Sequence, residues 1–246
     1  MNQNRRTAFV LAAGLGTRLK ELTKDNPKAL VTINNKPLLK VILENLTSNG
    51  FNHIVVNIHH FGDKIIRFLE DNKFPGIDIE ISDERDLLMD TGGAILKAMP
   101  LFLKSEAVLV HNVDVLTDVN LKEFYDNFIN SKDAAWLLTQ QRNSKRKLVF
   151  DKNDNFLGRF NTETNIFDGK GLMPKDCKTL SFSGIHLFKP QYFKDFELKP
   201  CYIFELYKAI AEKNYVRSQL IHPDYWFDLG TQEQLKNAES WLSSTR

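Results

Sequence analysis

Cysteine is scarce in this sequence, and long apolar runs are missing from it. The 246 residues include two cysteines, Cys177 and Cys201, which form no CxxC pair. This pattern excludes a disulfide framework and a zinc site, and it favours a reducing cytoplasm. No stretch approaches the roughly 18 apolar residues that a membrane-spanning helix needs. Residues 8–13 are apolar but lead into glycines and charges, so neither a signal peptide nor a membrane anchor is expected.

The sequence also has little net charge. Its 33 lysines and arginines against 31 aspartates and glutamates leave +2. This balance excludes bulk attraction to nucleic acid or to an anionic membrane, so any phosphate must be recognised by a few local groups. Repeats, low-complexity tracts and Gly/Ser linkers are absent as well. Residues 1–246 are therefore expected to form a single domain.

What the sequence does contain is an alternation of strands and helices. Residues 8–12 read AFVLA, a short apolar run typical of a strand buried on both faces. Leu38, Ile42 and Leu46 then share one helical stripe, which stops at Asn49-Gly50. Further strands are expected at 53–58, 77–81 and 107–111, and helices at 63–71 and 91–99. Strands that alternate with helices indicate an α/β fold with a doubly wound sheet.

This alternation breaks in the second half of the chain. After a helix at 121–128 and a strand at 134–140, residues 147–150 and 156–160 flank the turn-forming sequence DKNDN. That arrangement predicts an antiparallel hairpin. Residues 161–179 are interpreted as an insertion or flexible excursion. Strands at 180–188 and 215–221, a helix around 203–210 and a helix at 232–242 complete the expected elements.

Two cationic residues stand near the first strand in contexts that suit phosphate binding. The sequence Gly14-Leu15-Gly16-Thr17-Arg18 follows that strand directly, and its glycines leave backbone N–H groups open to an anion. It matches neither the three-glycine dinucleotide fingerprint nor the Walker A loop. A plain strand-to-helix turn is the alternative. Lys28 follows Pro27 and precedes an apolar pair, so it could lie at the same pocket, although an isolated lysine is usually on the surface.

Two aspartates are candidate ligands of a hard metal ion. Asp114 ends the apolar strand sequence LVHNVD, at the edge of the sheet where open α/β folds bind ligands. Asp228 lies in WFDLGT, before Thr231, a plausible N-cap of the last helix. Each aspartate also has a simpler interpretation. Asp114 could cap a turn, and Asp228 could be a hydrogen-bonded loop residue.

These motifs together resemble one known family. The run FVLAAGLGTRLKELTKDNPKALVTINNKPLL, with Asp114, the DTGG sequence at 90–93, SFSGI at 181–185 and WFDLGT, resembles the sugar-1-phosphate nucleotidyltransferases, also called NDP-sugar pyrophosphorylases. The resemblance spans nearly the whole chain. It is most similar to the short uridylyltransferase type that acts on N-acetylmuramate 1-phosphate, because few residues follow the WFDLGT helix and no left-handed β-helix domain is expected.

The resemblance implies a fold, a reaction and a set of site residues. The fold would be a Rossmann-like mixed sheet in three α/β/α layers. The enzyme would combine an NTP, expected from the resemblance to be UTP, with a sugar 1-phosphate to give an NDP-sugar and pyrophosphate. Arg18 and Lys28 would be catalytic through their charges, and Asp114 and Asp228 would bind Mg²⁺. The implied nucleotide-binding residues are Ala12, Ala13, Gly14, Gly16, Thr17, Ser82, Gly92 and Gly93, and the implied sugar-binding residues are Glu163, Ser183 and Gly184.

One departure from the family pattern leaves alternatives open. Family members carry Asn-Gly-Asp where this chain has Asn112-Val113-Asp114. Valine resists a positive φ, so either the backbone stays extended and the pocket is reshaped, or ligand approach is impaired. The alternatives are a guanylyl- or cytidylyltransferase for mannose, heptose or glucose 1-phosphate, a choline-phosphate type of cytidylyltransferase, and a non-catalytic nucleotide-sugar sensor. The sequence predicts no oligomeric state.

Overall fold

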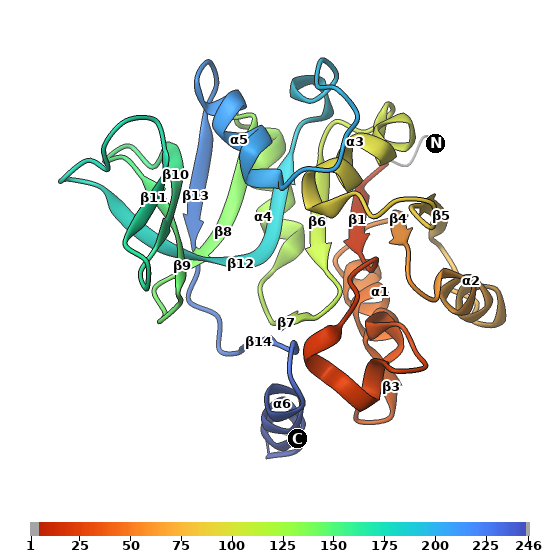
Figure 1. Ribbon diagram of the computed structural model, residues 1–246. Helices are drawn as coiled ribbons and strands as arrows, with labels where there is room; N and C mark the ends of the chain where they lie inside the picture. Colours follow the sequence, from red (N-terminus) through yellow and green to blue (C-terminus); the bar gives the residue numbers. More distant parts are fainter. Residues whose placement is uncertain (1–4, 245–246) are drawn as a thin grey trace. The chain divides into compact units, whose positions relative to one another are not determined.

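The computed structural model describes residues 5–244 of the chain. These residues form two compact units, each assembled from separate stretches of sequence (Figure 1). The first unit comprises the residues up to Leu88, then His111–Lys122 and the residues from Pro223 onwards. The second comprises Met89–Val110 and Glu123–His222. Strand β6 (Val108–Asn112) and helix α4 (Leu121–Ile129) each contain one of the points where the chain passes from one unit to the other.

The first unit is built on three parallel strands. Strand β1 (Thr7–Leu11) pairs with β4 (His53–Ile58), and β4 pairs with β5 (Asp78–Asp83). Helix α1 (Leu38–Ser48) and helix α2 (Gly62–Asp71) connect them, as parallel neighbours require. All six residues of β4 are buried, which explains its unbroken run of mostly apolar side chains. The strand predicted at 53–58 is therefore confirmed.

Helix α1 shows how the predicted stripe becomes a packed face. Its buried residues are Leu38, Leu39, Ile42, Leu43 and Leu46. The helix ends at Ser48, and Gly50 follows with φ +82°, a left-handed conformation that glycine adopts without steric cost. The predicted stop at Asn49-Gly50 is confirmed.

Several short elements complete the first unit, and the sequence did not predict most of them. They include the 3₁₀ helices η1 (Thr17–Thr23) and η2 (Lys28–Leu30), and a hairpin of β2 (Thr32–Ile33) and β3 (Lys36–Pro37). Strand β7 (Val115–Thr117) pairs antiparallel with β14 (Trp226–Asp228). Helix α6 (Gln232–Ser244) follows, and the Thr231 hydroxyl accepts a hydrogen bond from Gln234 N at 3.2 Å. Thr231 therefore caps the last helix, as predicted.

The second unit is mainly antiparallel. Strand β12 (Lys178–Phe188) pairs with β8 (Ala135–Gln140) and with β9 (Arg146–Phe150), and β9 pairs with β10 (Phe156–Asn161), all antiparallel. Strand β13 (Val216–Leu220) is parallel to β8. Helix α3 (Asp90–Phe102) contacts α5 (Ile203–Ala211), and the 3₁₀ helix η3 (Pro190–Tyr192) follows β12. The hairpin predicted around DKNDN is confirmed, and the parallel and antiparallel pairs of the two units agree with a mixed sheet.

The interpretation of residues 161–179 as a flexible excursion is wrong for part of that segment. Strand β11 (Ile166–Gly169) pairs antiparallel with β10. The two strands approach closely because Gly158 has no side chain, and a Cβ there would lie 2.3 Å from Asp168 O. Across the pair, Arg159 forms an ion pair with Asp168 at 2.8 Å. Because β11 has only four residues, it lacked the alternation that identifies longer strands.

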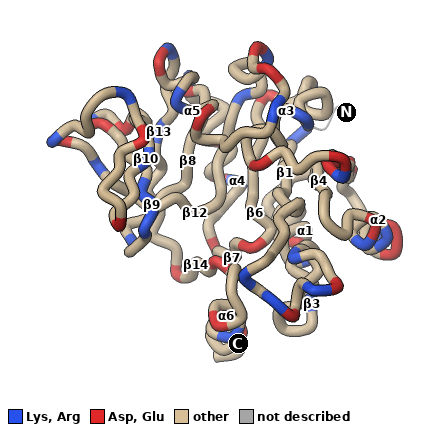
Figure 2. The backbone as a smooth tube through the Cα atoms, in the orientation of Figure 1, with Lys and Arg blue, Asp and Glu red and all other residues tan. Residues whose placement is uncertain are grey.

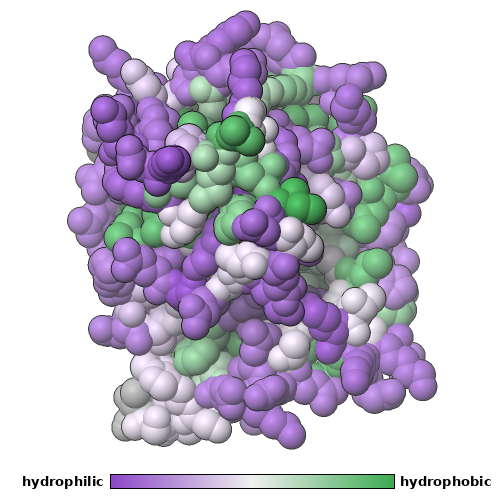
Figure 3. Space-filling view, turned by 60° about the vertical axis from the view of Figure 1, so that its left-hand side comes forward, coloured by the Kyte–Doolittle hydropathy of each residue, from purple (hydrophilic) through white to green (hydrophobic). Residues whose placement is uncertain are grey.

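Charge and hydropathy along the chain agree with the composition. Figure 2 shows lysines and arginines interspersed with aspartates and glutamates, which fits the small net charge of +2. In Figure 3 the visible face carries mainly hydrophilic residues, with apolar residues in smaller groups between them. Among residues 5–244 no helix has the length and apolar character needed to cross a bilayer.

Candidate active site

The glycine loop after β1 owes its shape to Gly16. This residue has φ +64° and precedes η1, and its carbonyl accepts hydrogen bonds from Leu19 N and from the Thr23 hydroxyl, both at 2.9 Å. A Cβ on Gly16 would lie 2.9 Å from a Thr23 methyl group and 3.0 Å from Lys28 Cβ. Gly16 is therefore required both by its backbone conformation and by the packing of η1 against η2. Gly14 is exposed in this loop, and Thr17 and Arg18 are exposed at the start of η1.

Lys28 and Asp114 form an ion pair within the first unit. Their side chains are 10% and 16% exposed. Lys28 stands at the start of η2, directly after the extended Pro27, and Asp114 stands between β6 and β7. The simple surface interpretation of Lys28 is therefore wrong. The pair places one cation and one anion together in a largely desolvated position, where both act more strongly than they would in bulk water.

Asp228 is brought to the same place by the backbone. Asp228 pairs with Val115 across β14 and β7, and Leu229 N donates to Asp114 O at 2.8 Å. The two aspartates thus stand on neighbouring segments, although they are 114 positions apart in sequence. Asp228 Oδ1 is buried and has no hydrogen-bond partner among the described residues 5–244. A buried carboxylate oxygen of this kind is costly unless something else binds it.

Gly230 explains how Arg18 joins this group. A Cβ on Gly230 would lie 2.5 Å from Arg18 Nη2 and 2.8 Å from Asp228 Oδ1. The Arg18 guanidinium and the Asp228 carboxylate therefore both border this glycine, and any side chain there would displace them. Sequence reasoning missed Gly230. The signal was present in WFDLGT, but a glycine after a short strand also suits an ordinary turn.

The cluster fits a hard divalent cation. Carboxylate oxygens are the ligands that Mg²⁺ prefers, and it usually keeps few protein ligands beside water and phosphate oxygens. Asp114 and Asp228 supply such oxygens from adjacent segments, and Asp228 Oδ1 is available for one. Arg18 and Lys28 leave the cluster balanced in formal charge. That balance lets it accept both a cation and the phosphate groups that would arrive with it.

Val113 fits its position without backbone strain. It is not among the residues with positive φ in the described chain, and its N–H donates to Leu11 O at 3.2 Å. Its side chain is 3% exposed. His111, two residues earlier, is fully buried, and burial lowers its pKa to about 4, against smaller opposing effects of the Asn112 carbonyl and the Asp114 charge. The strand that leads to Asp114 is therefore uncharged at neutral pH.

The two alanines before the glycine loop are held by a side chain that sequence reasoning missed. Asn57 Oδ1, on β4, accepts hydrogen bonds from Ala12 N at 2.6 Å and Ala13 N at 3.2 Å. Its amide nitrogen donates to Glu84 Oε1 at 2.8 Å. Ser82, on β5, is buried and pairs with Asn57 in the parallel register. The only sequence signal was one polar residue near the end of the apolar run HIVVNI.

In the second unit, Gly92 and Gly93 serve close packing. Both amides donate to Cys201 O, at 2.8 and 3.2 Å. A Cβ on Gly93 would lie 2.6 Å from Lys199 O, and one on Gly92 would lie 2.9 Å from Cys201 O. The segment before α5 therefore approaches the start of α3 closely, and the glycines make that approach possible.

Of the three predicted sugar-binding residues, Ser183 and Gly184 lie in β12 of the second unit, and Glu163 lies in a turn of the same unit. Ser183 is buried in β12 and accepts a hydrogen bond from Gln140 Nε2 at 3.1 Å. Gly184 follows with φ +79°, where the pairing of β12 with β8 shifts register. Glu163 lies in the turn between β10 and β11 and forms an exposed ion pair with Lys145 at 2.7 Å. The structure shows no hydrogen bond between Glu163 and β12 among residues 5–244.

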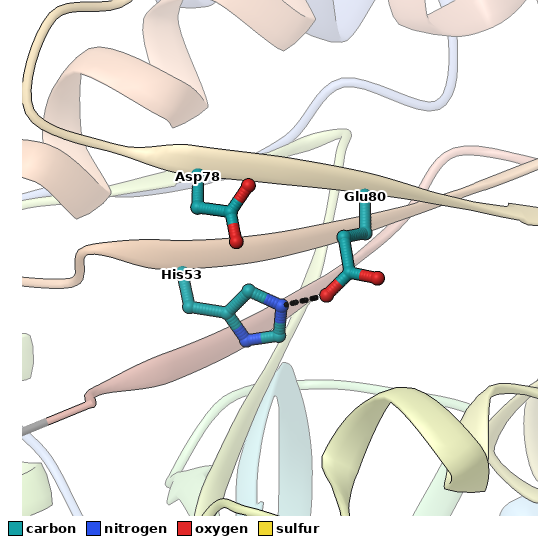
Figure 4. Close-up of side chains that lie close together, drawn as sticks. All are labelled: His53, Asp78 and Glu80. Atoms are coloured by element: carbon teal, nitrogen blue, oxygen red, sulfur yellow. Dashed lines mark hydrogen bonds and ion pairs between the residues drawn. The ribbon is translucent and has the colours of Figure 1, made fainter.

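A second group of ionisable side chains lies at the other end of the parallel strands. His53, Asp78 and Glu80 have donor atoms within 4.8 Å of one another and could hold a metal ion (Figure 4). However, His53 Nε2 is already hydrogen-bonded to Glu80 at 2.8 Å, and Arg5 forms an ion pair with the same Glu80 oxygen at 3.0 Å. The arginine supplies the positive charge that a metal would bring. We therefore interpret this group as a hydrogen-bonded network.

Comparisons with known proteins agree with this site. The sequence model of the nucleotidyl transferase family matches residues 7–244. The chain is 31% identical over 250 residues to the N-acetylmuramate alpha-1-phosphate uridylyltransferase of Caulobacter vibrioides, covering 99% of each chain. It is 30% identical over 226 residues to the D-glycero-alpha-D-manno-heptose 1-phosphate guanylyltransferase of Campylobacter jejuni, covering 92% of this chain and 95% of that one.

A solved structure supports the predicted fold. HddC of Yersinia pseudotuberculosis, crystallised with GMP-PN, superposes with a TM-score of 0.75 at 20% identity and covers 96% of this chain and 99% of its own. This similarity shows the nucleotide-diphospho-sugar transferase fold, with a mixed sheet flanked by helices. With the family match and the two relatives, it establishes that the chain belongs to the nucleotidyl transferase family and is an enzyme of the sugar-1-phosphate nucleotidyltransferase type.

Proposed function

We propose that this enzyme transfers UMP from UTP to a sugar 1-phosphate, releasing pyrophosphate. The observation that carries the proposal is the cluster of Arg18, Lys28, Asp114 and Asp228 beside the glycine loop, with a buried Asp228 oxygen that has no partner among residues 5–244. Transfer of a nucleotidyl group from one phosphate to another brings several negative charges together. Two cationic side chains, and a metal ion held by two carboxylates, would neutralise those charges. The uridylyltransferase relative supports the choice of base.

The reaction needs positioning and charge neutralisation more than proton transfer. An oxygen of the sugar 1-phosphate attacks the α-phosphorus of the NTP, the bond to the β-phosphate oxygen breaks, and pyrophosphate leaves with that electron pair. The attacking oxygen is already anionic, so no general base is required. Backbone N–H groups around Gly14 and Gly16, with Arg18, hold the β- and γ-phosphates, and Lys28 neutralises charge at the α-phosphate.

Asp114 and Asp228 would hold Mg²⁺ in this proposal. When bound, the ion neutralises charge on the phosphate oxygens that meet in the reaction. Lys28, which forms an ion pair with Asp114, would then lie next to the ion. Because Asp228 Oδ1 has no competing donor within residues 5–244, it can bind a cation without first giving up a hydrogen bond.

The remaining predicted contacts are part of the proposal. Ala12, Ala13, Thr17 and Ser82 belong to the nucleotide side in the first unit. Gly92 and Gly93 are also assigned to the nucleotide, although the Cys201 carbonyl already accepts from both of their amides. The sugar side consists of Glu163, Ser183 and Gly184. We further propose a cytoplasmic enzyme whose partners are an NTP and a sugar 1-phosphate, without nucleic acid or membrane.

A substrate grid tests the reaction and the choice of base together. Pyrophosphate release is measured with Mg²⁺ for four NTPs against a panel of sugar 1-phosphates that includes N-acetylmuramate and heptose 1-phosphates. We expect turnover with UTP and the muramate substrate. Turnover with GTP and a heptose would instead support guanylyl transfer, the activity in the name of the Campylobacter relative. Binding of an NDP-sugar without turnover in any combination would contradict the proposed catalysis.

We also propose that residues 1–246 act as one domain. Neither unit is a continuous stretch, since the chain changes unit after Leu88, Val110, Lys122 and His222. Such interleaving favours a single cooperative unfolding transition. Tryptophans allow the test, because Trp136 lies in the second unit and Trp226 and Trp241 lie in the first. We would unfold two variants in urea, Trp136→Phe and the double variant Trp226→Phe/Trp241→Phe. In each variant, the midpoint followed by tryptophan fluorescence should equal the midpoint followed by far-UV circular dichroism. Fluorescence midpoints that depart from the circular dichroism midpoint would contradict one domain.

A further inference from the structure

Asn57 is a buried polar side chain at the end of an otherwise apolar strand. It is 3% exposed and lies between Val56 and Ile58, which are fully buried. In the parallel register of β1 and β4, Asn57 stands opposite Leu11, the last residue of β1. A buried amide at this position needs partners for its oxygen and for its nitrogen. Its partners are the Ala12 and Ala13 amides, assigned above to the nucleotide side, and Glu84, two residues after Ser82.

The Asn57 oxygen continues the β1 hydrogen bonding beyond the end of that strand. It accepts from Ala12 N at 2.6 Å and from Ala13 N at 3.2 Å. Ala12 and Ala13 are 2% and 4% exposed, so water could not easily replace this acceptor. A buried N–H without a partner is unfavourable, because its hydrogen bond to water is lost and not replaced. The two residues that lead into the glycine loop are therefore held by one side-chain atom.

The Asn57 nitrogen donates to a buried carboxylate. Glu84 Oε1 accepts this bond at 2.8 Å, and Glu84 is fully buried. A carboxylate can only accept, so it decides which way the Asn57 amide is turned and directs the amide oxygen to the alanines. The Glu84 backbone is fixed as well, because its N–H donates to Ile58 O at 2.8 Å and its carbonyl is hydrogen-bonded to His59 Nδ1 at 2.7 Å.

We infer that Asn57 is a positioning residue that joins the glycine loop to Ser82–Glu84, at the end of β5, and thereby sets the geometry for the NTP. The inference rests on the proposed function. It predicts that changes at Asn57 raise the KM for the NTP much more than the KM for the sugar 1-phosphate. Asn57 does not touch the reacting atoms. Its effect comes from the placement of the backbone N–H groups that follow Ala13.

An exchange of charge between the two side chains tests this inference. Asn57→Asp brings two carboxylates into contact, whereas Glu84→Gln removes the charge and keeps the shape. In the double variant Asn57→Asp/Glu84→Gln, the new carboxylate at position 57 still accepts from Ala12 N and Ala13 N. It also accepts from the new amide at position 84, so the bond between the two side chains is restored with donor and acceptor exchanged. Glu84 has further contacts beyond these, so each result is compared with Glu84→Gln alone.

The measurements are NTP affinity by calorimetry without sugar phosphate, KM for each substrate, and the free energy of unfolding. We expect Asn57→Asp to weaken NTP binding by about tenfold or more. The double variant should return to within about threefold of Glu84→Gln, which is the signature of a direct interaction between the two sites. Asn57→Ser, which is too short to reach Glu84, should raise the KM for the NTP and serves if Asn57→Asp does not fold. Asn72→Asp, at the end of α2, is the matched control.

The outcomes separate this inference from the proposed function. An Asn57→Asp protein with unchanged NTP affinity would overturn the positioning role. Equal losses for both substrates without rescue in the double variant would also overturn it, because general loosening of the fold explains that pattern. If the unaltered protein bound no NTP, the proposed function would fail instead. The unfolding measurements would still show whether residues 57 and 84 interact.

Discussion

Asp228→Asn is expected to lower kcat by about a hundredfold or more, with little change in stability. Asp228 Oδ1 is buried and has no hydrogen-bond partner among the described residues, so the folded protein loses no internal bond when the charge is removed. The substitution should instead weaken the binding of the metal ion. Mn²⁺ binding followed by electron paramagnetic resonance, with and without NTP, measures it independently of turnover. Asp224→Asn, an exposed carboxylate on the same segment, is the matched control.

Asp114→Asn should give a similar loss of kcat for a different combination of reasons. Asp114 is the partner of Lys28, and removal of its charge leaves a lysine side chain with 10% exposure unpaired. Breaking a buried ion pair costs about 3 kcal/mol or more, although the residual exposure here reduces that figure. The variant should therefore unfold at a lower temperature, unlike Asp228→Asn. Undiminished turnover in both variants would refute the assignment of these aspartates to a metal.

Acid is expected to destabilise the protein well before its carboxylates are protonated. Burial lowers the pKa of His111 to about 4 and that of His186 to about 3. In the unfolded chain both return to about 6.5. Between these values the unfolded state binds protons that the folded state does not, so the free energy of unfolding falls as the pH falls below about 6.5. Each histidine contributes a slope of up to about 1.4 kcal/mol per pH unit.

Urea unfolding at pH 7.5, 6.5, 5.5 and 5.0 measures this slope. His186→Gln should flatten it, because one buried site is removed, although the loss of the bond to the Tyr207 hydroxyl lowers stability at every pH. His60→Gln, at an exposed position, is the control and should leave the slope unchanged. A free energy of unfolding that stays constant between pH 7.5 and 5.0 would show that both histidines titrate normally in the folded protein.

The long elements of the first unit, and the residues of its glycine loop with Lys28, could be predicted from the sequence because each shows a local pattern. Helix α1 carries a full apolar stripe, and Gly14, Gly16 and Lys28 lie in one continuous motif, so local pattern suffices to find them. Asp114 and Asp228 were candidates from their own segments, but each also had a simpler interpretation as a turn or loop residue, which the sequence left open. Nothing local in either segment shows that Leu229 N donates to Asp114 O and brings the two together.

What the sequence did not predict depends on contacts between distant residues. Strands β7 and β14 have three residues each, too few for any periodicity, and they exist because they pair with each other. Asn57 looked like an interruption of an apolar run, since its partners Ala12 and Glu84 lie 45 and 27 positions away. Gly230 looked like a turn residue until Arg18 was placed beside it.

The first unit is assembled from three separate stretches of sequence, and this affects the order in which its site forms during synthesis. Arg18 and Lys28 belong to its first stretch, Asp114 to its second, and Asp228 to the stretch that begins at Pro223. A nascent chain on the ribosome therefore exposes both cations and one aspartate long before the second aspartate emerges. Strand β7 has no β14 to pair with during that time. If the cluster binds a metal as proposed, it can do so only after residue 228 has emerged, and a premature stop before residue 223 would leave a chain with the glycine loop but without Asp228.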